Sequence, residues 1–215
     1  MEAISNDAKV LIGRRRQRTR PTREETRERI LEGATKAFAE RGFHGASQDD
    51  ICARVGLTRG AFNSSFKSKE ELFFALYDKM IDEVRERFDT ALRAAEKKGA
   101  PSSRAFFEEF VRHIPFGRDW HLLNTEFNLH AIRNPSVADR LAVRRNALVQ
   151  TIAEGVTTVL DRQGRRLAVD PHRLARLLLA IHDGSLAQSL VEPGKLSPDE
   201  FLVSFGSGVV DHFSM

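Results

Sequence analysis

Glycine and proline residues divide this chain of 215 residues into segments of helical length, and this punctuation constrains the fold more than any other feature. Within the segments, apolar residues recur at three- and four-residue spacing, as they do on the buried face of a helix. Ile30, Ala34, Ala37 and Phe38 are one example. No segment shows the apolar–polar alternation typical of a half-buried strand. The sequence therefore predicts an all-α fold with about nine helices.

Capping residues set the expected helix limits. Thr22 with Glu25, and Ser68 with Glu71, match the capping-box pattern at a helix start. Asn134-Pro135, Asp170-Pro171 and Ser197-Pro198 mark other boundaries, because proline suits the first turn of a helix and disfavours helical backbone before it. The expected helices span about 22–42, 47–56, 58–66, 68–99, 102–115, 119–133, 136–163, 170–191 and 197–213.

Basic residues are concentrated in the first third of the chain. Residues 1–69 hold 15 Lys and Arg against 9 Asp and Glu, whereas residues 70–215 hold 19 against 21. This asymmetry indicates a polyanion-binding end on a nearly neutral body. Residues 1–20 lack apolar periodicity and are expected to form a disordered arm. Its arginines suit DNA phosphates or a narrow minor groove, the alternative being a solubilising tail: Arg14, Arg15, Arg16, Arg18 and Arg20.

Other features exclude several classes of protein. The single cysteine, Cys52, allows no disulfide within the chain, and no apolar run is long enough for a membrane span or a signal peptide, so a cytoplasmic location is expected. No hydrolase, zinc or phosphate-loop motif occurs, which argues against an enzyme, a metal and a cofactor. Two alternatives remain: an acid–base or metal site built from the scattered histidines, and a non-specific architectural DNA binder.

Two short helices joined by Val55-Gly56-Leu57 form the most informative pattern. A helix-turn-helix needs a tight turn, which glycine allows, and apolar residues that fix the angle between its helices. The second helix can then lie in the major groove. It would present Arg59, Gly60, Asn63 and Ser64 outward. The alternative is a solvated hairpin within a larger helical bundle.

The residues from 42 to 72 resemble the DNA-binding domain of the tetracycline-repressor (TetR) family. The resemblance is carried by Gly42-Phe43, by Asp50-Ile51 through Val55-Gly56-Leu57-Thr58-Arg59-Gly60-Ala61-Phe62, and by Phe66-Lys67-Ser68-Lys69-Glu70-Glu71-Leu72. With the helix that begins at Thr22, it covers about 22–72. Beyond that range it rests on chain length and helicity alone.

The resemblance implies a ligand-responsive dimer that binds a pseudo-palindromic operator in double-stranded DNA, usually as a repressor, and releases it when a small molecule binds. After the arm at 1–20, the expected units are a helix-turn-helix domain at 21–68 and a helical ligand-binding and dimerisation domain at 69–215. Besides the arm, the residues expected at DNA are Ser47, Gln48, Thr58, Arg59, Gly60, Asn63, Ser64, Ser65 and Lys69. Asn63 and Ser65 stand where the family usually has Tyr and often His, so one phosphate contact is lost, while Asn63 can pair with adenine.

The C-terminal domain is expected to hold a small, largely apolar effector. A pocket for such a molecule needs apolar walls and a few polar anchors. The candidates, which could equally be ordinary core, are Phe106, Phe110, His113, Trp120, Leu123, Glu126, Phe127, His130 and His182. The resemblance places a four-helix dimer interface on the last two helices, the alternative being intrachain core. Its candidates are Leu174, Leu178, Ile181, Ser185, Phe201, Phe205, Gly208 and Val209.

Overall fold

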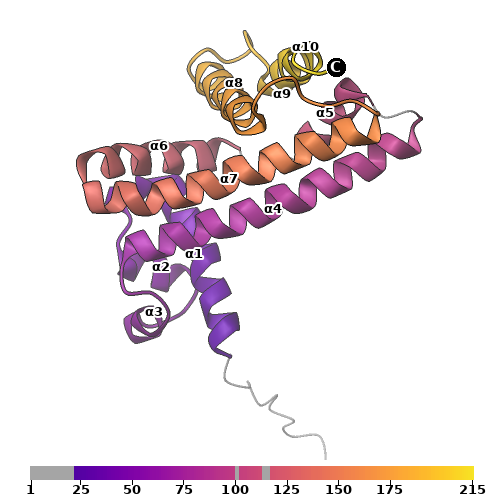
Figure 1. Cartoon of the computed structure of the whole chain (residues 1–215). Helices are drawn as coiled ribbons and strands as arrows, with labels where there is room; N and C mark the ends of the chain where they lie inside the picture. The colour runs from indigo at the N-terminus through magenta and orange to yellow at the C-terminus, as the bar shows by residue number, and fades with distance from the viewer. Residues whose placement is uncertain (1–21, 100–101, 113–116) are drawn as a thin grey trace, which may run out of the picture.

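A computed structural model describes residues 22–99, 102–112 and 117–215, and over these ranges the chain is all helical, as the sequence predicts (Figure 1). Three helices form a compact unit at the N-terminal end: α1 (Arg23–Gly45), α2 (Gln48–Arg54) and α3 (Arg59–Ser65). The capping box at Thr22 and Glu25 is confirmed, and Asp50 completes a second one with Ser47.

Two long helices connect this unit to the rest of the molecule. α4 (Lys69–Lys97) leaves the three-helix unit and runs beside α7 (Pro135–Arg162) for most of its length (Figure 1). α5 (Ser103–Val111) packs on α4, and α6 (Arg118–Arg133) packs on both α7 and α1. α6 is thus the second element, after α4, through which the C-terminal helices touch the N-terminal unit.

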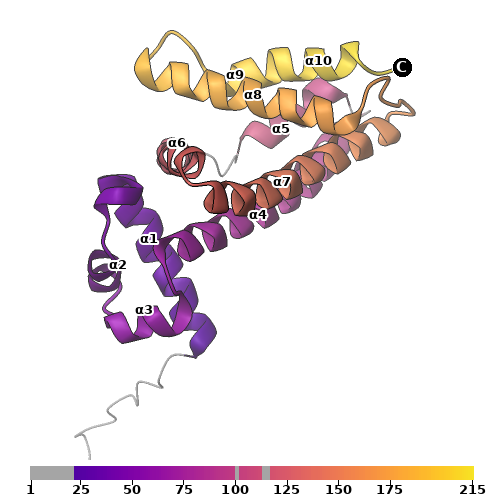
Figure 2. The ribbon, with the colours of Figure 1, turned by 60° about the vertical axis from the view of Figure 1, so that its left-hand side comes forward.

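A further layer covers the side of α7 and α5 that faces away from the three-helix unit (Figure 2). It consists of α8 (Pro171–Val191) and a last helix built from α9 (Pro198–Phe201), the π-helical turn η1 (Leu202–Gly206) and α10 (Ser207–His212). Counting that last helix once, the described ranges hold the nine helices expected. None of them combines the length and apolar character that a membrane span requires.

The structure differs from the expected helix details in three places. Ser68 Oγ accepts the Glu71 N–H, but the Glu71 carboxylate accepts the N–H of Lys67 rather than that of Ser68, so the second half of that capping box is shifted by one residue. Helix α1 does not simply end at Gly42 but bends there, because Gly42 adopts φ 71° and helical turns continue to Gly45. The π-helical turn in the last helix is the third difference.

Phenylalanine side chains fill two parts of the core. Phe73 and Phe127 stack with ring centroids 3.6 Å apart, and Phe43 meets Phe127 edge-on at 4.9 Å. Farther along α4, Phe88 packs against Phe106 and Phe110 of α5. Phe106 and Phe127 are therefore core residues, which is the alternative that the sequence left open for these two pocket candidates.

Candidate nucleic-acid interface and effector cavity

The α2–turn–α3 unit has the geometry of a helix-turn-helix. Gly56 lies in the turn at φ 62°, a backbone conformation that glycine adopts without steric cost. The Leu57 N–H donates to the Cys52 carbonyl at 3.0 Å, which closes the turn. Ile51 and Phe62 are completely buried between the helices and α1. The apolar faces of α2 and α3 therefore fix their angle and leave the opposite face of α3 free.

That opposite face carries five of the residues expected at DNA. Thr58, Arg59, Gly60, Asn63 and Ser64 are all exposed, and they follow one another along the outer side of α3 and its N-cap. The Arg59 guanidinium lies 3.4 Å from the Asp49 carboxylate, and both side chains are mostly exposed. An exposed ion pair of this kind is weak enough to be exchanged for a phosphate or a base.

Ser65 differs from these five. Its side-chain oxygen is buried, and it has no hydrogen-bond partner among the described residues. It therefore lies at the edge of the face rather than on it.

Arginines of α1 hold the other end of α3. Arg23 donates to the Ser64 carbonyl at 3.5 Å and Arg27 to the Ser65 carbonyl at 3.3 Å, while Arg29 donates to the carbonyl of Val55 in the turn. The last carbonyls of a helix lack partners within it and carry partial negative charge, so cations stabilise them. These arginines support α3 from behind its exposed face.

Lys69 has a similar internal role in this conformation. Its ammonium donates to the carbonyls of Phe43, His44 and Ala46 at 2.8, 3.2 and 2.9 Å. Burial lowers the pKa of Lys69, although the charged form makes these bonds. Because an ammonium has three N–H donors, a phosphate contact by Lys69 would require one of these bonds to be exchanged.

A shallow depression surrounds this point and brings several expected residues together. It has a volume of about 430 Å³ and lies where α2 and α4 begin. Ser47, Gln48, Arg59 and Lys69 line it, as does Lys67, which the sequence reasoning missed. Arg59, Lys67 and Lys69 outnumber the two carboxylates of its lining, Asp49 and Glu70, and helix starts carry partial positive charge, so the depression suits a DNA phosphate. The five arm arginines and His113 lie outside the described residues.

Three of the effector candidates lie instead at the junction between α6 and the N-terminal unit. A Glu126 carboxylate oxygen accepts the Phe43 N–H at 2.6 Å, directly beside Gly42. Phe127 packs against the Phe43 ring, and His130 Nε2 lies 3.4 Å from a Glu70 oxygen. None of the three lines any of the three cavities between the C-terminal helices that are described next.

A cavity of about 250 Å³ lies between α4, α6, α7 and α8. Trp120 and His182 line it, as expected, together with residues that the sequence reasoning missed. The latter are Tyr77, Met80, Asn124, Arg145, Leu148, Arg176, Leu179, Ala180 and Asp183. Burial raises the pKa of the Tyr77 hydroxyl, while the nearby Arg145 charge acts in the opposite direction, so the hydroxyl stays protonated at neutral pH.

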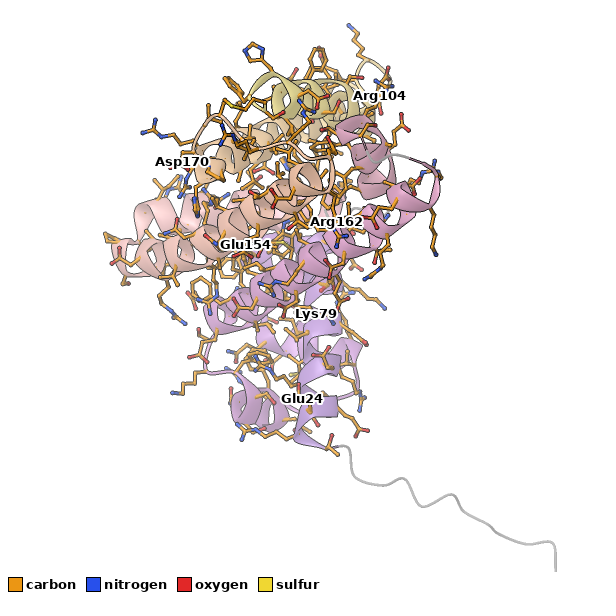
Figure 3. The ribbon with its side chains drawn as sticks, turned by 45° about the vertical axis from the view of Figure 1, so that its right-hand side comes forward. Glu24, Lys79, Arg104, Glu154, Arg162 and Asp170 are labelled. Carbon is orange, nitrogen blue, oxygen red and sulfur yellow. The ribbon has the colours of Figure 1, made fainter. Side chains whose placement is uncertain are left out.

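Two more cavities adjoin this one. The first, of about 480 Å³, shares Met80 and Trp120 with it and extends past Leu123 to Leu31 of α1. Lys79, which also lines it, lies where α4 leaves the N-terminal unit, between the labelled Glu24 and the α7 residues in Figure 3. The second is small, at about 40 Å³, and is lined mainly by apolar side chains, Phe110 among them.

Arg145 did have a sequence signal. It falls four residues after Leu141 and three before Leu148, both buried, so it occupies a core-facing position on α7. A charged side chain at such a position marks an internal polar site. Arg176 has no comparable signal, because its exposed position on α8 resembles any other surface arginine.

The expected dimer residues divide into two groups. Leu174, Leu178 and Ser185 are buried within the single chain, because α8 turns them toward the core. Phe205 and Gly208 are exposed, and the side chain of Phe205 is 55% accessible. Ile181, Phe201 and Val209 are half-buried. Leu177, 41% exposed on α8, belongs with the exposed group.

Known proteins are similar to this chain at both ends. Residues 30–76 match the model of "Bacterial regulatory proteins, tetR family", and residues 100–204 match that of "BetI-type transcriptional repressor, C-terminal". The transcriptional activator FasR of Mycolicibacterium smegmatis is 28% identical over 77% of this chain and 71% of its own length. The regulator UidR of Escherichia coli is 28% identical over 75% of this chain and 80% of its own.

Solved structures give the same fold. Salmonella enterica GusR superposes with a TM-score of 0.62 at 28% identity, covering 86% of this chain and 95% of its own. A TetR transcription regulator from Haloarcula marismortui superposes with a TM-score of 0.64 over 89% of this chain and all of its own. At 17% identity, this second likeness concerns the fold alone.

Proposed function

The chain belongs to the tetR family of DNA-binding bacterial transcription regulators, and on that premise we propose that it is a ligand-responsive repressor acting as a dimer on a pseudo-palindromic operator. The observation that carries this proposal is the exposed outer face of α3, whose inner face is anchored by the buried Phe62. A rigid helix with small and polar residues outward can approach base edges closely.

We assign the DNA contacts in two groups. Arg59, Gly60 and Asn63 would enter the major groove, with Thr58 and Ser64 beside them. The depression where α2 and α4 begin would receive the phosphate backbone through Ser47, Gln48 and Lys67. Ser65 and Lys69 have supporting positions in this arrangement. The arm of residues 1–20 would add phosphate or minor-groove contacts through its arginines.

The two chains would meet through α8 and the last helix. Support comes from Phe205 and Leu177, which are large, apolar and exposed on these helices, and from Gly208, beside which a neighbouring chain finds open space. Family members dimerise, and a twofold axis in the protein matches a pseudo-palindrome in the DNA. The proposed units are the arm at 1–20, the helix-turn-helix domain at 21–68 and the sensor and dimer domain at 69–215. A regulator of bacterial DNA acts in the cytoplasm.

The effector would bind in the cavity between α4, α6, α7 and α8. Helix α6 gives that cavity a physical link to DNA binding, because Trp120 and Asn124 line the cavity while Glu126 and His130, less than two turns farther on, contact Phe43 of the N-terminal unit. A ligand that shifts α6 would therefore shift α1. That displacement would change the spacing of the two α3 helices in a dimer and release the operator.

Selection of bound fragments from a random DNA pool at near-physiological salt tests the proposal. Recovery of one inverted repeat is the expected result, and recovery of fragments without a common motif would favour the architectural alternative. On the recovered site, Asn63→Ala should weaken binding and relax preference at one base pair, each base pair being worth about 1–3 kcal/mol. Thr158→Ala, which removes an exposed neutral polar side chain on α7, is the matched control. If Asn63→Ala changed neither affinity nor preference, Asn63 would not belong to the interface.

A further inference from the structure

The cavity between α4, α6, α7 and α8 contains two arginines whose charges have no counterion. Across the described residues, no carboxylate oxygen lies within 4.0 Å of Arg145 or Arg176. Their hydrogen-bond partners are neutral: the Asn128 amide, at 2.8 Å from Arg145, the Tyr77 hydroxyl, which Arg145 also contacts, and the Asn146 amide, at 2.7 Å from Arg176. By contrast, Arg144, the residue before Arg145 on α7, is paired with Asp78 at 2.8 Å.

From this we propose that the effector is a small organic anion whose acidic group binds between Arg145 and Arg176 and whose flat apolar part lies against Trp120. The inference rests on the function proposed above and adds the chemical class of the ligand. Each guanidinium has five N–H donors in a fixed plane, and the Asn128 and Asn146 amides and the Tyr77 hydroxyl engage only some of them. The remaining donors match the two oxygens of a carboxylate.

One acidic side chain also faces the cavity and must be set against the two arginines. Asp183 lies on its α8 wall, and its carboxylate is 53% exposed and 3.3 Å from His182 Nδ1. It is thus directed toward solvent and His182. Two arginines against one aspartate leave the cavity with net positive charge, and Arg145 is half-buried, where screening by water is weaker.

Asn124 adds a second requirement. Its side-chain oxygen is buried in the cavity wall and accepts no hydrogen bond from the described residues. A buried acceptor without a partner is unfavourable, so a ligand that donates a hydroxyl or N–H proton there would be preferred. Trp120, Met80 and Leu179 form the apolar wall. With about 250 Å³ available, these groups together describe a single substituted ring that carries an acid and a hydrogen-bond donor.

Binding of 2-, 3- and 4-hydroxybenzoate to the full-length protein tests this ligand class, with the matching hydroxybenzamides as neutral controls. Calorimetry gives the affinities. Trp120 is the only tryptophan of the chain, so its emission, corrected for ligand absorption, reports whether the ligand sits beside it. We expect at least one carboxylate to bind at least about tenfold more tightly than its amide.

Substitutions then locate the acidic group. Arg145→Gln and Arg176→Gln should each reduce the affinity for the carboxylate about tenfold or more and leave that for the amide nearly unchanged. Arg173→Gln, one turn before Arg176, exposed and not lining the cavity, is the matched control and should change neither. Three results would overturn the proposal. They are equal affinity for acids and amides, a preference for the acid that persists in both variants, and no binding by any hydroxybenzoate up to about 10 mM.

The same titrations on operator-bound protein separate this inference from the proposed function. If hydroxybenzoates bind with the expected preference but leave the operator complex intact, the ligand class holds and the regulatory role of the cavity fails. If a neutral molecule releases the operator while the acids do not bind, the regulatory role holds and the ligand class fails.

Discussion

Replacing Gly42 with alanine tests how the DNA-binding unit is joined to the sensor helices. Gly42 adopts φ 71° and ψ 171°, a region open almost only to glycine, and another residue there costs on the order of 1–3 kcal/mol. A Cβ atom at this position would lie 2.5 Å from both carboxylate oxygens of Glu126. The carboxylate would have to move and give up its hydrogen bond from the Phe43 N–H. For a half-buried charged acceptor that loss is worth about 1.5 kcal/mol. The total expected loss of stability is roughly 2.5–4.5 kcal/mol.

A double-mutant cycle separates these two contributions. In a Glu126→Ala background the close contact and the hydrogen bond are both absent, so Gly42→Ala should cost only the backbone strain. The two substitutions should therefore couple by about 1.5 kcal/mol, with the double variant more stable than additivity predicts. Gly45→Ala is the control, because its new methyl group would meet only Arg41 Cβ at an ordinary 3.5 Å. It should change stability by no more than about 0.5 kcal/mol.

Urea unfolding followed by circular dichroism at one fixed protein concentration gives the free energies, the concentration being held because dimerisation contributes to stability. If Gly42→Ala costs the same in both backgrounds within about 0.3 kcal/mol, the contact between Gly42 and Glu126 is not formed in solution, and α6 does not hold the N-terminal unit in this way.

Three further substitutions or truncations test other parts of the molecule. Deleting residues 1–20 should reduce the slope of log DNA-binding constant against log salt concentration by up to about 4.5 per chain, which is 0.9 for each arginine that contacts a phosphate. An unchanged slope would exclude the arm from the interface. Hydrogen bonds from the Ser47 hydroxyl and N–H hold the pKa of Asp50 below its ordinary 3.8, so its stabilising effect is present above that pH and is lost as the pH falls through the folded-state pKa. The urea midpoint should therefore fall less between pH 5 and pH 3 in Asp50→Asn than in the wild type, and an equal fall would contradict this cause. Phe205→Glu should raise the dimer dissociation constant at least about 30-fold in sedimentation experiments, whereas Val143→Glu, on an exposed apolar residue of α7, should not; equal effects would move the interface elsewhere.

Local patterns in the sequence were sufficient to predict the helices and the helix-turn-helix. A capping threonine or serine accepts a hydrogen bond from a backbone N–H three residues away, and a glycine in a turn allows a positive φ angle at its own position. Both features are local, so they can be recognised from a few consecutive residues. In the structure Thr22 and Thr58 cap their helices, and Gly56 adopts a positive φ angle in the turn. The π-helical turn at Leu202–Gly206 has no such local signature, because it arises where the last helix packs on α5 and α8.

The effector cavity depends on packing between distant segments, and there the sequence was a weaker guide. The aromatic residues of α5 and α6 led to the prediction that these helices line the pocket, but aromatic side chains fill cores as readily as they line pockets. Helix α6 crosses α1 beyond Asn124, so its next turns contact the DNA-binding unit rather than the cavity. The arginines of the cavity come from α7 and α8, and only the packing of these helices brings Arg145 and Arg176 to one space.

The distribution of charge shows why composition alone misjudges a DNA-binding surface. Of the 15 basic residues in 1–69, nine fall at 22–69, against seven acidic ones, and most of the nine are engaged within the protein. Arg23, Arg27 and Lys69 bind carbonyls, and Arg41 and Arg54 pair with carboxylates. These contacts hold α2 and α3 in position. Because seven acidic residues offset nine basic ones at 22–69, the folded unit has little net charge to add to long-range attraction. The attraction for DNA must then come mainly from the arm and from α3 itself, and for that reason the truncated arm should affect the salt dependence more than any single substitution within the folded unit.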